Sequence, residues 1–347
     1  MKRVRYFDLL RVVCFCMIIW YHMLVELCND GMLALEDVSP WFANANIHIG
    51  TLSVAVFFML SGASLTISTR GQIHYKQFYV KRGLRLLVPF YFVNICCFII
   101  RMIQVKSFSL LITGTAPWKI FLGITGIDAW LGLYGVSSFS QGIGEWFLGC
   151  LVILYAVFPL LRKLMNKNET VFLAVVASIY IVMIYHYLSP VPVHQNILVK
   201  GCEFVFGMYL GKYWEKLDKK ILIVSLPAVM FCFTSSTPLV INDGLKITIS
   251  ALVFFVTFSF AENILQKSTC VYPVIRFLSG CSYELFLVHH IVIISLTSAA
   301  GRFICNKMNL WILFIAELAA MAAFTALVKV SCDYCILRMK RIFGING

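Results

Sequence analysis

An arginine and a histidine interrupt the apolar stretch near the N-terminus, RYFDLLRVVCFCMIIWYHMLVEL. Arg11 and His22 are separated by 11 positions. On a helix this spacing places both side chains on one face, about 16 Å apart along the axis. An ionisable group at membrane depth is costly and usually faces a partner or a protein-lined space, and a neutral imidazole can act as a general base. Arg11 and His22 are therefore candidate catalytic residues.

Each of these two residues also has a structural explanation. Arg11 can extend to the inner membrane surface and pair with Asp8, three residues earlier on the same helix. His22 can be a neutral histidine that is held by hydrogen bonds within the protein. The spacing alone is compatible with both interpretations.

A basic cluster leads into another apolar stretch, in YVKRGLRLLVPFY. Arg82 and Arg85 are three residues apart and share a helix face, and Lys81 lies beside them. Guanidinium groups bind phosphates through two parallel hydrogen bonds, so we predict a cytoplasmic anion site formed by Lys81, Arg82 and Arg85. The alternative is that positive charge at this boundary only sets the membrane topology.

Further polar residues lie within apolar stretches. Ser282 and His289 are seven positions apart in SGCSYELFLVHHIVI, nearly on one helix face. Glu203 follows Lys200 by three residues, a spacing that also suits an internal ion pair. Glu145 begins the motif EWFLGCLVILYAVFPLL. We expect four of these residues to bind the acceptor or support the site: His289, Ser282, Glu203 and Glu145. For His289, packing in the core is the alternative.

The composition indicates a polytopic membrane protein. Of the 347 residues, 61% are hydrophobic and only 13% are charged, whereas about a quarter of the residues in soluble domains are charged. The net charge of +13 lies largely in short loops between apolar stretches, so membrane orientation explains it better than nucleic-acid binding. Cys332 and Cys335 form one Cys-x-x-Cys pair, which lacks the four ligands of a zinc site, and no metal is expected.

Ten apolar stretches are each close to the roughly 20 residues that a bilayer crossing requires. They predict an all-α polytopic membrane protein, a bundle of about ten transmembrane helices. The expected spans are 7–28, 48–69, 84–104, 143–163, 170–189, 197–215, 220–237, 246–265, 280–299 and 309–331. The first span follows a basic start and precedes no small-residue cleavage site, so we interpret it as a retained helix rather than a signal peptide.

Lysine and arginine fall mainly on one side of these spans. With the N-terminus in the cytoplasm, 20 of the 29 lie in inside segments and 7 in outside segments, with Arg11 and Lys329 set aside. Cytoplasmic loops carry an excess of these residues, so we predict that both termini are cytoplasmic. We also expect residues 1–347 to form a single integral membrane domain, with no extra soluble domain. The long connection 105–142 is expected to form short amphipathic pieces at the outer interface.

Taken in order, these motifs resemble the acyltransferase-3 family of integral membrane O-acyltransferases. FDLLR with the Arg11–His22 spacing is similar to the first helix of that family, VFFMLSG to its second, and KRGLRLLVPFY to the basic pair before its third-helix proline. WFLGCLVILYAVFPLL and CSYELFLVHH are similar to two later elements, and the second places the family histidine at His289. Leu151 and Val152 stand where many members have two glutamates, which leaves the acceptor open.

The resemblance implies an enzyme that moves an acyl group, usually acetyl, from cytoplasmic acyl-CoA to a hydroxyl of an envelope glycan or lipid-linked sugar. Acyl-CoA is then a substrate, and no permanently bound cofactor is expected. The implied partners are acyl-CoA, the sugar acceptor and the lipid bilayer of the plasma or inner membrane, and the oligomeric state stays open. His22 would act as a general base or carry the acyl group itself.

Two other classes of protein fit the same sequence. A transporter or flippase for a sugar or lipid-linked sugar also has charges within its spans, but such proteins often show paired halves, and no internal match of that kind is found. A catalytically inactive relative that serves as a membrane sensor is the other. Hydrolysis or protection of acetyl-CoA by the purified protein, without any gradient, separates the enzyme from the transporter.

Overall fold

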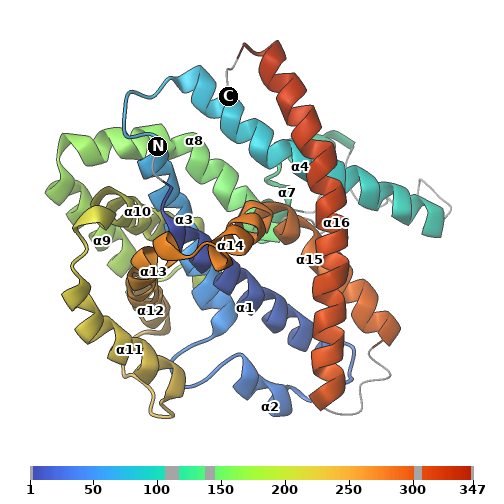
Figure 1. Ribbon diagram of the computed structural model, residues 1–347, viewed down its shortest axis with the longest axis horizontal. Coiled ribbons are helices and arrows are strands. Elements are labelled where there is room, and N and C mark those ends of the chain that lie inside the picture. The colour runs from blue at the N-terminus through green and yellow to red at the C-terminus, as the bar shows by residue number, and fades with distance from the viewer. Residues whose placement is uncertain (1–2, 106–116, 137–144, 301–306, 345–347) are drawn as a thin grey trace. The chain divides into compact units, whose positions relative to one another are not determined.

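The computed structural model describes residues 3–105, 117–136, 145–300 and 307–344 (Figure 1). In these ranges the chain forms helices joined by turns, and one isolated bridge between Ala43 and His48 is the only strand-like pairing described. The predicted all-α class is therefore confirmed for this part of the chain.

The α-helices differ widely in length. They are α1 (Arg5–Asn29), α2 (Leu35–Val38), α3 (Ile49–Ser68), α4 (Tyr75–Val105), α6 (Ile120–Thr125), α7 (Asp128–Gly132), α8 (Glu145–Lys167), α9 (Glu169–Tyr185), α10 (Ile197–Tyr213), α11 (Leu222–Thr234), α12 (Asp243–Thr257), α13 (Ala261–Lys267), α14 (Val271–Gly280), α15 (Ser282–Ala300) and α16 (Lys307–Ile342). Short 3-10 turns are η1 (Ser39–Trp41), η2 (Pro117–Lys119), η3 (Val193–Gln195), η4 (Trp214–Lys216), η5 (Lys219–Ile221) and η6 (Phe258–Phe260).

Seven helices in the described ranges are long and apolar enough to cross a membrane. They are Arg5–Asn29, Ile49–Ser68, Tyr75–Ile100, Trp146–Lys167, Asp243–Lys267, Ser282–Ala299 and Asn309–Ile342. The other three predicted spans coincide with shorter helices, because α9 and α10 have 17 residues each and α11 has 13. The multi-pass architecture is confirmed, whereas the number of ten and the cytoplasmic termini stay predictions.

Contacts divide the chain into two compact units. Unit 1 contains residues 1–70, 165–282 and 292–318, and unit 2 contains residues 71–164, 283–291 and 319–347. Unit 1 therefore holds α1 to α3 and α9 to α14, and unit 2 holds α4, α6, α7 and most of α8, whose last three residues belong to unit 1. The helices α15 and α16 contribute residues to both units.

In unit 1, α3 packs against α1, α10 and α12 (Figure 1). The approach of α3 to α10 depends on glycines that face the neighbouring backbone. A Cβ atom added to Gly62 would lie 2.0 Å from the carbonyl oxygen of Phe204, and one added to Gly207 would lie 2.0 Å from that of Met59. Small residues allow helix backbones in membranes to pack this closely. The close packing fixes α3, whose Ser64 takes part in the site described below.

In unit 2, α4 packs against α8. The rings of Phe78 and Phe158 stack with centroids 5.6 Å apart, and the Tyr79 hydroxyl donates to the Ala156 carbonyl at 2.9 Å. The described part of the connection 105–142 contains the short elements η2, α6 and α7. That these pieces are amphipathic and lie at the outer interface stays a prediction. Residues 106–116 and 137–144 of that connection lie outside the described ranges.

Candidate active site

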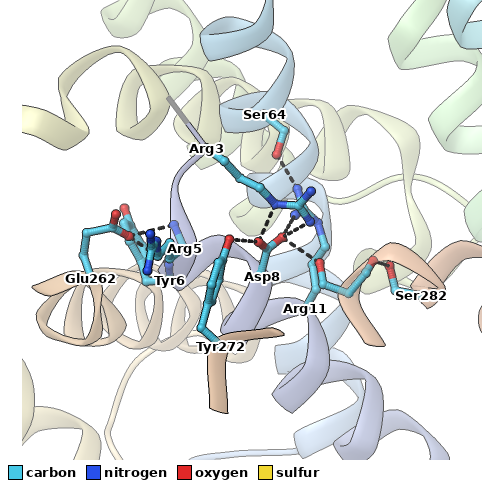
Figure 2. A network of polar contacts seen from close by, with 10 residues as sticks. Arg3, Arg5, Tyr6, Asp8, Arg11, Ser64, Glu262, Tyr272 and Ser282 are labelled. Carbon is cyan, nitrogen blue, oxygen red and sulfur yellow. Dashed lines mark hydrogen bonds and ion pairs between the residues drawn. The ribbon is translucent and has the colours of Figure 1, made fainter. Parts of the chain in front are cut away.

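Asp8 is the centre of a polar network at the start of α1 (Figure 2). Its carboxylate is 1% exposed and accepts five hydrogen bonds. Arg3 donates two of them, from Nε at 2.6 Å and from Nη2 at 2.9 Å, and Arg11 Nη1 donates a third at 3.2 Å. The other two donors are the hydroxyl groups of Tyr272, at 3.0 Å, and Ser279, at 2.8 Å. Two carboxylate oxygens offer about four lone-pair sites, so Asp8 is fully satisfied.

The Asp8 network joins separate helices of unit 1. Tyr272 and Ser279 belong to α14, and Arg3 precedes α1. The hydrogen bonds to Asp8 raise the pKa of Arg3 above its ordinary value. Burial raises the pKa of Tyr272, and the nearby Asp8 carboxylate adds to that shift. Both changes keep the donors protonated, so the network stays intact at neutral pH.

Arg11 is held on two sides. Besides its bond to Asp8, its Nη2 donates to Ser64 Oγ on α3 at 2.5 Å (Figure 2). The ion pair with Asp8 that was the structural alternative for Arg11 is therefore present. A quarter of the Arg11 side chain is nevertheless exposed. The guanidinium thus has a fixed position and an accessible part.

Glu262 provides a cap for α1 that the sequence reading missed. The residue before the helix, Val4, has no side chain that can accept a hydrogen bond. Glu262 Oε2 instead accepts from the backbone N–H groups of Arg5, at 2.7 Å, and Tyr6, at 3.0 Å (Figure 2). Free N–H groups at a helix start require such acceptors, and a negative charge there is favourable. An acidic residue near the end of an apolar stretch was the available signal.

The helix α14 was also missed, because residues 266–279 were expected to be only a connection between two spans. Its buried residues are Tyr272, Ile275 and Ser279. They follow one another by three and four positions, which is the spacing of one helix face. That spacing is a signal for an amphipathic helix, and it places both hydroxyl donors to Asp8 on the same side.

His22 lies on α1, the same uninterrupted helix as Arg11. Its side chain is partly buried, and its ring centroid is 4.9 Å from that of Tyr21. The Tyr21 ring in turn contacts His48, with centroids 4.7 Å apart. The expected helical spacing between Arg11 and His22 is therefore present, since α1 continues without a break from Arg5 to Asn29.

The basic cluster lies on α4 in unit 2. Lys81 and Arg82 are partly buried and Arg85 is exposed. The Arg82 guanidinium carbon is 6.0 Å from the centroid of the Phe78 ring, a distance at which cations are attracted to aromatic faces. The predicted cooperation of this cluster with Arg11 and His22 concerns both units and stays a prediction.

His289 is buried in α15, with an exposed fraction of 1%. Its Nδ1 lies 2.6 Å from the carbonyl oxygen of Phe286. A carbonyl oxygen only accepts hydrogen bonds, so Nδ1 carries the proton and Nε2 is the basic nitrogen of this tautomer. Ser282, at the start of α15, donates to the carbonyl oxygen of Ser279 at 2.9 Å. Ser282 is thereby linked to the Asp8 network through Ser279.

Glu203 forms the predicted internal pair with Lys200. The Lys200 Nζ and Glu203 Oε2 atoms are 2.8 Å apart, and each side chain is 1% exposed. The second oxygen of Glu203 accepts from Thr248 Oγ1 of α12 at 2.9 Å. The pair therefore joins α10 to α12. Glu145 is the first residue of α8, and its side chain lies outside the described part of the structure.

The structure thus brings Arg11 together with Asp8 and Ser64, and Glu203 together with Lys200 and Thr248. It provides a fixed guanidinium and an imidazole on α1, and a buried imidazole on α15. A guanidinium can bind or polarise an anionic group, and an imidazole can take a proton from a hydroxyl.

Comparison with known protein families gives a match to the acyltransferase domain (Acyl_transf_3) over residues 4–330. Neither the comparison with curated proteins nor that with solved structures gives a match. The matched range includes all seven candidate spans except the end of the last one. It also includes Arg11, His22, the basic cluster of α4 and His289. The chain belongs to the acyltransferase-3 family and has the helices of a multi-pass membrane acyltransferase.

Proposed function

We propose that the chain is an O-acyltransferase of the plasma or inner membrane. It transfers an acetyl group from cytoplasmic acyl-CoA to a hydroxyl of an envelope glycan or a lipid-linked sugar. The family match supports acyl transfer in general. The donor, the acetyl group and the acceptor are parts of the proposal.

The observation that carries the proposal is the arrangement on α1. One continuous helix of 25 residues holds Arg11 and His22, about 16 Å apart on one face. Arg11 is oriented by Asp8 and Ser64, and such fixed positions are what a site needs for precise placement of a substrate. The helix therefore has an anion-binding group near one end and a proton acceptor toward the other.

The acyl-CoA donor carries phosphate groups, for which the cluster Lys81, Arg82 and Arg85 is the proposed site. Arginine pairs with phosphate through two parallel hydrogen bonds, and lysine adds a point charge. Arg11 would bind the part of the donor that enters the membrane domain. No nucleic-acid partner and no permanently bound cofactor are included in the proposal.

In the chemical step, a ring nitrogen of His22 takes the proton of the acceptor hydroxyl. The oxygen attacks the thioester carbonyl carbon, a C–O bond forms and the C–S bond breaks. The departing CoA thiolate receives the proton from the His22 imidazolium, which restores the neutral ring. General-base catalysis of this kind contributes about 10²- to 10⁴-fold. His289, Ser282, Glu203 and Glu145 are proposed to position the acceptor or support the site.

The substitution His22→Ala tests the catalytic role. In purified protein supplied with acetyl-CoA, we expect the transfer rate to fall by about 10²- to 10⁴-fold. The control Cys16→Ala changes an exposed residue of the same helix and should leave the rate unchanged. Full transfer by a folded His22→Ala protein would rule out the role. Acetyl found covalently on His22 by mass spectrometry would make it an acyl carrier instead of a base.

The substitution Arg82→Ala tests the donor site. Loss of a charge-assisted phosphate contact should raise KM for acetyl-CoA by about 10- to 100-fold. Lys76→Ala removes one positive charge from an exposed position of the same helix and serves as the charge-matched control. Equal KM values for the two variants would show that the cluster does not bind the phosphate groups of acetyl-CoA.

The alternative is a transporter or flippase for a sugar or lipid-linked sugar. Buried charges such as the Lys200–Glu203 pair also occur in transporters. Comparison of the glycan mass of cells with and without the chain separates the two proposals. Acyl transfer adds the mass of one acyl group to the glycan, whereas transport alone leaves the mass of each unit unchanged.

A further inference from the structure

Glu317 is a fully buried acidic residue of α16, with an exposed fraction of 0%. It lies within the candidate span Asn309–Ile342. Its Oε1 accepts a hydrogen bond at 3.3 Å from Thr297 Oγ1 of α15, and Thr297 is also 0% exposed. Both residues belong to unit 1. Sequence reading did not select either of them.

Among the described buried acids of unit 1, Glu317 differs in its second oxygen. In the described ranges, Glu317 Oε2 has no hydrogen-bond partner and no ion pair. The other buried acids of unit 1 that the structure describes are satisfied: Asp8 has five donors, Glu203 has Lys200 and Thr248, and Glu262 has two backbone N–H groups and Gln266. A buried polar atom without a partner needs an explanation, and a bound ligand, ion or water is one of them.

Aromatic residues accompany this carboxyl group. Phe314 lies three residues before Glu317 on α16 and contacts Trp20 of α1 edge-on, with centroids 5.1 Å apart. Trp20 stacks on Trp311 at 4.6 Å and on Trp41 at 5.8 Å. Small-molecule sites combine aromatic walls with a few convergent polar groups. Phe314 thus brings this ring cluster to within about one helical turn of Glu317 along α16.

The chemistry of Oε2 limits what the ligand can be. A hard metal ion requires several oxygen ligands, and the described hydrogen bond joins only two side chains, Glu317 and Thr297. A hydroxyl group is neutral, donates one hydrogen bond and accepts another. It can therefore satisfy Oε2 without bringing a charge into the membrane.

We infer that Glu317 and Thr297 form a hydroxyl-binding subsite, at which Glu317 Oε2 forms a hydrogen bond with an alcohol group of the sugar acceptor. The identity of the ligand as an acyl acceptor rests on the proposed function, but the binding itself does not. Glu317 is an acceptor-binding residue, and Thr297 is a positioning residue that fixes the carboxyl group through Oε1.

Infrared difference spectra of the full chain in nanodiscs test the binding without acyl-CoA. The probes are octyl glycosides of glucose, galactose and N-acetylglucosamine, and the control ligand is fully acetylated octyl glucoside, which has no free hydroxyl. We expect a free-hydroxyl glycoside to shift a carboxyl band that is missing in Glu317→Gln. Difference spectra that are identical in the two proteins for all three probes would overturn the inference.

Transfer kinetics provide the second measurement. With acetyl-CoA as donor, Glu317→Gln should raise KM for the best glycoside by about tenfold or more and leave KM for acetyl-CoA unchanged. Thr297→Val retains the Glu317 carboxyl group and is the second variant in case Glu317→Gln does not fold. It should raise KM for the glycoside by a smaller factor. Thr325→Val removes another buried hydroxyl of α16 and is expected to change neither KM.

The infrared and kinetic measurements test the subsite and the proposed function separately. A glycoside-dependent band that requires Glu317, in a protein that transfers no acetyl group, would retain the subsite and reject the proposed function. Acetyl transfer with an unchanged acceptor KM in Glu317→Gln would retain the function and reject the subsite.

Discussion

Asp8 and Glu317 are both buried carboxyl groups in unit 1, with exposed fractions of 1% and 0%, but their surroundings differ. Asp8 accepts five hydrogen bonds, which come from Arg3 just before α1, from Arg11 of its own helix and from two residues of α14. Glu317 accepts one, and its second oxygen has no partner in the described part of the chain. Burial alone therefore does not distinguish a structural acid from one that binds a ligand.

The number of satisfied lone pairs gives that distinction. A fully satisfied carboxylate holds its neighbours in place, so its removal leaves several donors without an acceptor. When one oxygen of a carboxyl group has no partner, substitution removes fewer hydrogen bonds, and a ligand can form a new hydrogen bond to that oxygen. We therefore expect Asp8 to determine stability and Glu317 to determine binding.

The largest effect on stability is expected for Asp8→Ala. The change leaves two guanidinium groups and two hydroxyl groups without their acceptor, and it should lower the free energy of unfolding by about 3 kcal/mol. This value is near the low end for buried ion pairs, because Arg3 and Arg11 are partly exposed. Reversible unfolding in mixed detergent micelles measures it.

Asp243→Ala is the matched control for this prediction. Asp243 also pairs with a basic residue three positions later, Lys246, but it is 90% exposed. Exposed pairs contribute about 0 to 1 kcal/mol. If the two alanine variants lose equal stability, the Asp8 network does not have the structural role assigned to it.

A smaller effect is expected for Glu262→Ala, which removes the acceptor at the start of α1. Loss of a helix cap costs about 0.5 to 2 kcal/mol. Glu262→Gln retains an oxygen that can accept from Arg5 N and Tyr6 N, so it should recover most of that loss. Both values come from the same unfolding measurement, and equal losses in the two variants would show that charge, rather than hydrogen bonding, is what α1 requires.

The start of α3 is capped by a histidine, His48, whereas the start of α1 is capped by the carboxyl group of Glu262. His48 Nδ1 accepts from Thr51 N at 3.3 Å, and burial lowers the pKa of His48 below its ordinary value. The unfolded chain therefore binds more protons in mild acid, and stability should fall as the pH drops below about 6.5. The expected loss is below about 1 kcal/mol.

His48→Asn retains a cap without the titration, so it should flatten this part of the pH profile. His194 will keep a residual slope, because burial, together with the charge of Lys200, also lowers its pKa. The measurement is the free energy of unfolding between mildly acidic and neutral pH. A profile identical to that of the unsubstituted chain would exclude His48 as the source.

The smallest effect on stability is expected for Glu317→Gln. The amide oxygen still accepts from Thr297, and Oε2 has no described partner to lose. The free energy of unfolding should therefore change by no more than about 0.5 kcal/mol. A loss as large as that of Asp8→Ala would show that Glu317 is structural too, and would remove the distinction between the two acids.

The sequence predicted the long helices well, because uninterrupted apolar runs define them. The first span was expected at 7–28, and α1 extends from Arg5 to Asn29. The prediction was weaker for α9, α10 and α11, because apolar residues continue beyond the ends of helices that have only 17, 17 and 13 residues. Hydropathy identifies apolar segments but not helix ends. Turns such as 186–192 also contain apolar residues, so the predicted spans are longer than the helices.

In the site, contacts within one helix could be predicted and contacts between distant segments could not. The Asp8–Arg11 and Lys200–Glu203 pairs follow from a spacing of three residues. The bonds from Tyr272 and Ser279 to Asp8 join residues 264 and 271 positions apart. No local pattern encodes such a pairing, because it depends on how helices pack. The open oxygen of Glu317 is likewise visible only once its neighbours are known.

The cap on α1 has a consequence for the order in which the protein is made. Glu262 is 257 positions after Arg5, so a ribosome adding about 5 to 20 residues per second reaches it roughly 10 to 50 s later. During that interval the first helix of the nascent chain has no acceptor from Glu262 for its leading amides. Chains terminated before Glu262 should therefore keep a frayed N-terminal turn, which hydrogen exchange at Arg5 and Tyr6 would reveal.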